Sequence, residues 1–273
     1  MAVDFSFKDR YNINDFLEIV RILRAPGGCP WDIEQTHESI RRGFIEETYE
    51  VIEAINKKDS ELLCEELGDV LLQVVFHASI EEDAGRFNFD DVCDGISKKM
   101  IVRHPHVFGD VTVSGTGEVL SNWDEIKRRT KKQGSVSESI NSIPRELPAL
   151  IRAEKTQSKA AKAGFDWSDA TGAYPKITEE LNEVIDAAAS GDRQELLTEI
   201  GDLLFAAVNV SRLLGVDPEE ALTASTDKFA RRFAQVEKLA GERNIDMKNS
   251  DLDVLDALWD EVKVAEHSAP DHT

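Results

Sequence analysis

The sequence lacks the cysteine pattern of a disulfide scaffold or a thiolate zinc site. Its three cysteines are odd in number and show no C-x-x-C spacing. Free cysteines suit a reducing compartment, so we expect a cytoplasmic protein. No apolar run approaches the ~20 residues that a membrane span requires, and residues 1–10 mix charged side chains with phenylalanine, unlike a signal peptide. We therefore expect no membrane partner.

Basic charge is also scarce. The chain has 32 Lys and Arg against 53 Asp and Glu, a net charge of −21. A nucleic-acid polymer is therefore an unsuitable main partner, because binding its phosphates requires a basic surface. The chain also lacks the P-loop, the dinucleotide-binding glycine motif, the G-x-S-x-G elbow and the H-E-x-x-H zinc motif, which excludes those enzyme classes.

Prolines are few, and no segment alternates with a period of two, so strands are not expected. Apolar residues instead recur three and four positions apart, which predicts an all-α fold. With 41% hydrophobic residues the chain can form real cores. We expect helices over residues 12–24, 38–57, 60–84, 90–103, 119–131, 146–162, 174–189, 193–214, 218–243 and 252–265.

An internal repeat divides the chain. Residues 46–54 (EETYEVIEA) return as residues 179–187 (EELNEVIDA), an offset of 133. At the same offset, residues 66–69 (ELGD) meet residues 199–202 (EIGD). We infer a tandem duplication of one helical domain. The expected domains are residues 1–132 and 149–273, joined by a Ser- and Pro-containing linker at 133–148.

Acidic side chains in the repeat have the spacing of metal ligands. Glu47 and Glu50 lie three apart on one helix, and Glu66 and Asp69 lie three apart on the next, so each pair shares a face. Such carboxylates would repel one another without cations, and hard oxygen ligands favour Mg²⁺, with Mn²⁺ as a substitute. The second half repeats the set as Glu180, Glu183, Glu199 and Asp202. A solvated acidic face is the alternative, but it explains neither the repetition nor two mid-helix glycines, Gly68 and Gly201, which we expect to allow close helix approach.

Basic residues with repeated spacing are candidates for phosphate contacts. Lys228 and Arg232 lie four apart, and so do Lys99 and Arg103 in the first half. Lys263 follows Trp259 by four residues; the tryptophan could pack in a core or lid the site. Lys176 stands four residues before Glu180 and can reach the same site, whereas its first-half counterpart is Gly43.

The spacing E-E-x-x-E followed by E-x-x-D resembles the all-α nucleoside triphosphate pyrophosphohydrolases, which are related to dimeric dUTPases. Further segments are similar to the tandem-domain bacterial MazG family: GCPWD at 28–32, RHPHVF at 103–108 and GFDW at 164–167. The resemblance covers nearly the whole chain.

The resemblance implies Mg²⁺-dependent hydrolysis of nucleoside triphosphates to the monophosphate and pyrophosphate, with a broad or house-cleaning role. It implies a four-helix core completed in a homodimer, with the C-terminal half as the main catalytic unit. Glu180, Glu183, Glu199 and Asp202 then match catalytic metal ligands, and Lys176, Lys228, Arg232, Trp259 and Lys263 match substrate contacts. One family phosphate contact, a lysine, is replaced by Glu195.

Two alternatives remain. The first is a non-catalytic acidic helical scaffold or regulatory module that docks a protein partner. The second places chemistry in both halves, because Glu47, Glu50, Glu66 and Asp69 are intact and could also hold metal.

Overall fold

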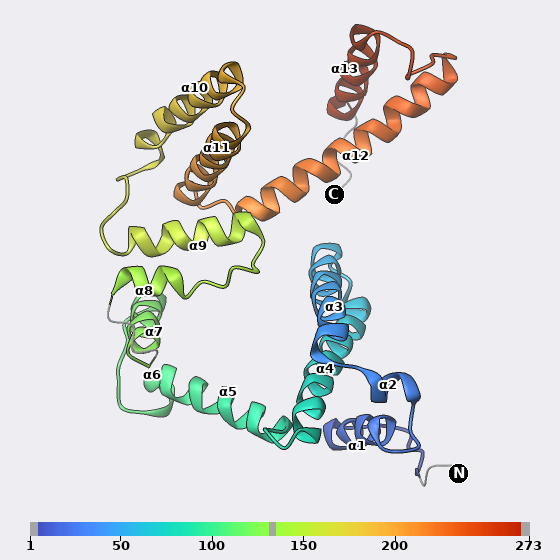
Figure 1. Ribbon diagram of the computed structural model, residues 1–273, viewed down its shortest axis with the longest axis vertical. Helices are drawn as coiled ribbons and strands as arrows, with labels where there is room; N and C mark the ends of the chain where they lie inside the picture. The colour runs from blue at the N-terminus through green and yellow to red at the C-terminus, as the bar shows by residue number, and fades with distance from the viewer. Residues whose placement is uncertain (1–4, 131–134, 269–273) are drawn as a thin grey trace. The chain divides into compact units, whose positions relative to one another are not determined.

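The computed structural model describes residues 5–130 and 135–268, and every regular element in these ranges is a helix (Figure 1). The expected all-α class is thereby confirmed. The chain forms two compact units, residues 1–127 and 128–273. Among the described residues, no helix has both the length and the apolar character needed to cross a bilayer.

The first unit is built around one helical hairpin. Its central helices, α3 (His37–Lys57) and α4 (Ser60–Asp83), pack along each other and carry the first acidic motif. The other helices that begin in this unit are α1 (Ile13–Arg24), α2 (Pro30–Glu34), α5 (Phe89–Arg103), α6 (Pro105–Phe108) and α7 (Thr116–Thr130).

The second unit has the corresponding hairpin. Here α10 (Tyr174–Ser190) packs along α11 (Arg193–Leu213), and these helices carry the second acidic motif. The remaining elements are α8 (Val136–Asn141), α9 (Ala149–Ala161), the 3₁₀ turn η1 (Ala170–Gly172), α12 (Pro218–Glu242) and α13 (Leu252–Ser268).

Both hairpins turn tightly at the same two positions. Lys58 ends α3 with φ 56°, and Gly191 ends α10 with φ 76°, so each first helix stops on a left-handed residue. The next residue is an aspartate in both cases. Asp59 and Asp192 accept hydrogen bonds from backbone N–H groups in the first turns of α4 and α11. The two helices of each hairpin are therefore held close together.

Each unit has a small apolar core. In the first, Val20 of α1 packs with Ile40, Val75 and Phe76 of the hairpin. In the second, α12 and α13 form a core from Val236, Ala240, Leu258 and Val262. These clusters explain why α1 and α13 are fixed against their neighbours.

The segment expected as a linker contains structure. Residues 131–134 lie outside the described part, but α8 follows at Val136–Asn141, and Ile143 is buried. Lys159 of α9 donates hydrogen bonds to the Ser139 carbonyl and the Ser142 hydroxyl, which fastens α8 to α9. Periodicity missed α8, as it missed α2 and α6, because helices of four to six residues contain too few turns to show a pattern.

Candidate metal centre

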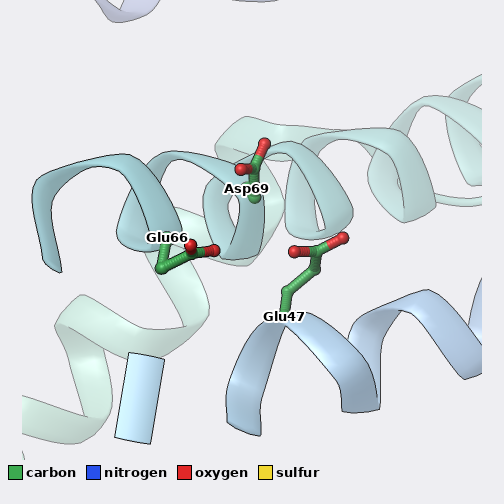
Figure 2. A group of neighbouring side chains, drawn as sticks. All are labelled: Glu47, Glu66 and Asp69. Carbon is green, nitrogen blue, oxygen red and sulfur yellow. The ribbon is translucent and has the colours of Figure 1, made fainter. Parts of the chain in front are cut away.

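Three carboxylates converge between the helices of the first hairpin. Glu47 extends from α3 toward Glu66 and Asp69 of α4, as Figure 2 shows. One oxygen from each lies within 4.8 Å of the others. All three side chains are half-buried. The i, i+3 spacing of Glu66 and Asp69 places both on the face of α4 that meets α3.

The electrostatics of this set show that its negative charge is poorly compensated. The pKa of Glu47 is raised, first by burial and then by the charge of Asp69. The pKa of Glu66 is raised as well, by burial and then by the charge of Glu50. Glu50 is exposed and lies outside the group of three, but it is near enough to act on both. A proton or a metal cation would relieve this repulsion.

The second hairpin repeats the arrangement with Glu180, Glu199 and Asp202, whose ligand oxygens also lie within 4.8 Å of one another. Glu180 is the most enclosed, with 5% of its surface exposed. Its Oε2 atom is buried and has no hydrogen-bond partner among the described residues. The pKa of Glu183 is raised, first because its protonated form can hydrogen-bond to Glu180 and then by burial.

A lysine distinguishes the second set from the first. The Lys176 ammonium lies 2.7 Å from Glu180 Oε1 and 2.8 Å from Glu179 Oε1. These contacts raise the pKa of Lys176, with Glu179 contributing most. At the corresponding first-hairpin position, Gly43 has no side chain. Thus the second carboxylate set contains a cation of the protein itself, and no ion pair of the described residues supplies one to the first.

The donor atoms suit a hard divalent cation. Mg²⁺ binds oxygen ligands at about 2.1 Å and keeps several sites for water or phosphate. Three carboxylate oxygens within 4.8 Å of one another need only small side-chain movements to share such an ion. The buried, unpartnered Glu180 Oε2 is the strongest sign that the set is incomplete without a cation.

The predicted substrate contacts on α12 and α13 form a separate group. The Arg232 guanidinium lies 5.9 Å from the Trp259 ring centre and hydrogen-bonds to Glu266 at 2.7 Å. Phe229 packs against Trp259. The Lys263 ammonium lies 2.7 Å from Asp260, and Lys228 is exposed. Trp259 borders the core of the second unit, and Arg232 lies over its ring; its packing agrees with the core role, and the lid role stays a prediction.

The first unit contains a related pair. The Arg103 guanidinium lies 5.2 Å from the Trp123 ring centre, and His104 packs edge-on against the same ring. The arginine–tryptophan pairing therefore recurs in both units.

Within one chain, the structure brings together only part of the predicted site. Lys176 joins the carboxylates. Among the described residues, no hydrogen bond, ion pair or ring contact links the carboxylates to Lys228, Arg232, Trp259 or Lys263. Sequence reasoning also missed three neighbours of these residues, namely Glu179, Phe229 and Glu266. Spacing could have indicated two of them, because Glu179 belongs to the repeated E-E-x-x-E motif and Phe229 precedes Arg232 by three residues. Nothing in the spacing of the sequence indicates Glu266.

Glu195, which stands where the resemblance implies a lysine, has a structural role. It lies in the first turn of α11, where an acidic residue is favourable beside exposed N–H groups. Its Oε2 accepts a hydrogen bond from the Ser190 hydroxyl at 2.9 Å. Glu195 thus stabilises the turn between α10 and α11.

The expectation for the two mid-helix glycines is wrong within a single chain. A Cβ atom added at Gly68 or Gly201 would meet nothing within 4 Å. Neither glycine is therefore required by a close helix contact in the described residues. Both are exposed, next to the exposed apolar residues Leu67 and Ile200.

Comparison with known proteins agrees with the fold and the acidic hairpins. Residues 35–108 and 170–236 each match the MazG nucleotide pyrophosphohydrolase domain. The two matches contain both hairpins and both carboxylate sets. The chain belongs to the MazG family, and it carries the family domain twice.

Similar proteins are found in several bacteria. The nucleoside triphosphate pyrophosphohydrolase of Escherichia coli K12 is 44% identical over 254 residues, 92% of this chain and 97% of that protein. The nucleoside triphosphate pyrophosphohydrolase/pyrophosphatase MazG of Thermotoga maritima is 45% identical over 251 residues, 91% of this chain and 94% of that protein. The nucleoside triphosphate pyrophosphohydrolase of Mycolicibacterium smegmatis is 41% identical over 153 residues, 55% of this chain and 46% of that protein.

Proposed function

We propose that the protein hydrolyses nucleoside triphosphates to the monophosphate and pyrophosphate with Mg²⁺. The observation that carries this proposal is the carboxylate set of α10 and α11, in which a buried Glu180 oxygen has no hydrogen-bond partner. The names of two relatives that are 44% and 45% identical support it, because both are pyrophosphohydrolases and both align over nearly their whole lengths.

The residues of the set have separable roles. Glu180, Glu183, Glu199 and Asp202 would hold Mg²⁺, with Mn²⁺ as a substitute, and the ion would supply Lewis-acid charge to the phosphates and to water. One carboxylate of the set accepts the proton of the attacking water. Lys176 supplies positive charge to the phosphates from beside Glu180, and Lys228, Arg232 and Lys263 add charge from α12 and α13. Trp259 presents an aromatic face to the nucleotide.

The C-terminal domain, residues 149–273, is proposed as the main catalytic unit because it contains Lys176. The N-terminal domain, residues 1–132, is the second candidate, and a specific observation favours it. The ligand oxygens of Glu47, Glu66 and Asp69 lie within 4.8 Å of one another, as do those of the second set. Glu50 would complete that site.

A homodimer is proposed to complete both the fold and the site. On α10, Leu181 and Ile185 are exposed four residues apart, and α11 exposes Leu197, Ile200 and Leu204 along one side. Together they form an apolar face with no cover among the described residues. A second copy would cover such a face, bring four helices together and offer its own α12 and α13 cations to the carboxylates.

Product analysis tests the reaction directly. The full chain is incubated with Mg²⁺ and each of a panel of standard and noncanonical nucleoside triphosphates, and the products are separated by ion-exchange chromatography. The proposal predicts equal amounts of monophosphate and pyrophosphate. Turnover across much of the panel would support a house-cleaning role. Diphosphate and phosphate as products would contradict the proposed cleavage, and no turnover with any substrate would favour the non-catalytic scaffold.

A further inference from the structure

The position of Lys176 in the second carboxylate set has a consequence beyond phosphate contact. Its ammonium lies 2.7 Å from Glu180 Oε1 and so pairs with one of the two carboxylate oxygens of the most buried ligand. The other oxygen, Oε2, is buried without a partner. A divalent cation that binds Glu180 therefore competes with a cation that is already present.

The helix itself does not favour a lysine at this place. Lys176 lies in the first turn of α10, which has no side-chain N-cap and no acidic residue in that turn. The N-terminal end of a helix carries partial positive charge, which disfavours an ammonium group. Lys176 is held there by Glu179 and Glu180, and once Glu180 binds a metal ion only the exposed Glu179 remains as partner.

The first unit provides a comparison without this lysine. Gly43 stands at the equivalent position, and the nearby Arg42 forms its ion pair at 2.8 Å with Glu46 and not with Glu47. Arg42 has 88% of its side chain exposed and so lies outside the carboxylate set. The first set is uncompensated, in agreement with the raised pKa values of Glu47 and Glu66.

We propose that Lys176 is a displaceable counter-ion of the second carboxylate set. Before metal binds, it neutralises part of the charge of Glu180 and lowers the affinity of the set for a divalent cation. Metal binding displaces the ammonium from Glu180, and the freed group can then meet an anion such as a phosphate. Cation binding and the supply of a phosphate-binding charge are thereby coupled. The inference rests on the proposed function in one respect, that this set binds a divalent cation.

The test measures metal binding without nucleotide, in the full chain. Mn²⁺ is titrated and its free concentration is followed by electron paramagnetic resonance. In an Asp69→Ala background, which disables the first set, Lys176→Met removes the charge and keeps the length of the side chain. We expect Mn²⁺ to bind Lys176→Met about tenfold more tightly than the parent, since one unit charge near partly exposed carboxylates has been removed.

The reciprocal change adds the charge to the first set. In an Asp202→Ala background, Gly43→Lys should weaken Mn²⁺ binding relative to Gly43→Met, which adds a neutral side chain of similar length. The new Cβ would lie 3.0 Å from Gln73 Nε2, the end of a flexible side chain that can move. Circular dichroism of each variant checks that the helices are retained.

The outcomes separate this inference from the function on which it rests. Tighter binding by Lys176→Met together with weaker binding by Gly43→Lys supports the counter-ion. Equal or weaker binding by Lys176→Met overturns the counter-ion and leaves the metal-dependent reaction standing. Failure of both the Asp69→Ala parent and its Lys176→Met derivative to bind Mn²⁺ overturns the metal site itself, and the inference with it.

Discussion

Glu199 shows how much of the site depends on individual side chains. It is half-buried on α11, and its ligand oxygen lies within 4.8 Å of those of Glu180 and Asp202. Glu199→Gln keeps the shape and removes the charge, so we expect pyrophosphate release to fall by about 100-fold or more, since even residues that only support metal ligands cost 10–100-fold. Steady-state kinetics with saturating Mg²⁺ measures this.

A matched control is Glu237→Gln, the same substitution at an exposed position on α12. It should leave the rate within about twofold, because isolated surface charges contribute little. Similar losses in both variants would show that net charge, and not a specific ligand, controls the rate.

Among individual residues, the sequence could predict those neighbours whose proximity depends on helical spacing alone. Glu66 with Asp69 and Lys176 with Glu180 share helix faces whatever the tertiary structure. The ion pair of Arg232 with Glu266 could not be predicted, because it joins two helices whose packing depends on their cores. The expectation that Gly68 and Gly201 allow close helix approach is wrong for the same reason, since it also depended on how helices pack.

The first hairpin contains a charged network that the second lacks. His37 of α3 and His77 of α4 share a hydrogen bond between their Nδ1 atoms at 2.7 Å, and His37 Nε2 lies 2.6 Å from Glu81 Oε1. Arg86 binds both oxygens of the same carboxylate. The positions 133 residues later are Ala170, Val210, Leu214 and Glu219. The network links the start of α3 to the end of α4 in the first unit only.

This network should make the first unit sensitive to acid. Hydrogen bonds from Arg86, and then from His37, lower the pKa of Glu81 from 4.5 to about 2. Its stabilising effect is therefore complete above pH 4.5 and is lost as the pH falls toward 2. Burial, and then the charge of His37, lower the pKa of His77 below 6.5. The stabilisation that the neutral His77 ring contributes to the fold is therefore lost as the pH falls below 6.5. Both changes destabilise the folded state at low pH.

Glu81→Gln tests the network. We expect a lower urea midpoint than wild type at pH 7 and a smaller difference from wild type at pH 3, because the carboxyl of the unfolded chain, with its ordinary pKa of 4.5, is mostly protonated there. Chemical denaturation followed by circular dichroism gives both midpoints. The control is Glu53→Gln, which breaks an exposed ion pair with Lys57 on α3 and should change neither midpoint appreciably. An equal loss at both pH values would show that the charge of Glu81 is not responsible.

At the scale of elements, the long helices could be predicted from periodicity, and their ends from capping residues. The caps at Asp59 and Asp192 and the left-handed Gly191 follow from local preferences, whereas the left-handed Lys58 does not. The short helices α2, α6 and α8 depend on tertiary contacts, such as those of Lys159 with α8, which no local pattern records.

The whole molecule consists of two related units that each expose an apolar hairpin face. In the first unit Ile45, Tyr49 and Ile52 are exposed along α3, and Leu67 and Leu71 along α4. The second unit likewise exposes apolar residues of α10 and α11, namely Leu181, Ile185, Leu197, Ile200 and Leu204. Large exposed apolar patches mark interfaces in soluble proteins. The duplication could be predicted from the offset of 133 residues, but which faces stay uncovered depends on how each chain packs.

Charge on this face should prevent self-association. We expect the double substitution Leu181→Glu and Ile185→Glu to convert a dimer to a monomer, because two charges would be buried in an apolar interface. Light scattering after size-exclusion chromatography measures the mass. The control Leu252→Asp replaces a leucine that is 77% exposed in the first turn of α13, where aspartate is compatible with the helix. A wild-type protein that is monomeric, or a double variant that remains dimeric, would contradict the proposed interface.

The most direct test of the central claim compares the two carboxylate sets within the full chain. Pyrophosphate release from a nucleoside triphosphate with Mg²⁺ is measured for the wild type, Asp202→Ala and Asp69→Ala. The account predicts that Asp202→Ala loses nearly all activity and that Asp69→Ala keeps most of it. Full activity in Asp202→Ala, or loss in Asp69→Ala alone, would contradict the assignment of catalysis to the second unit.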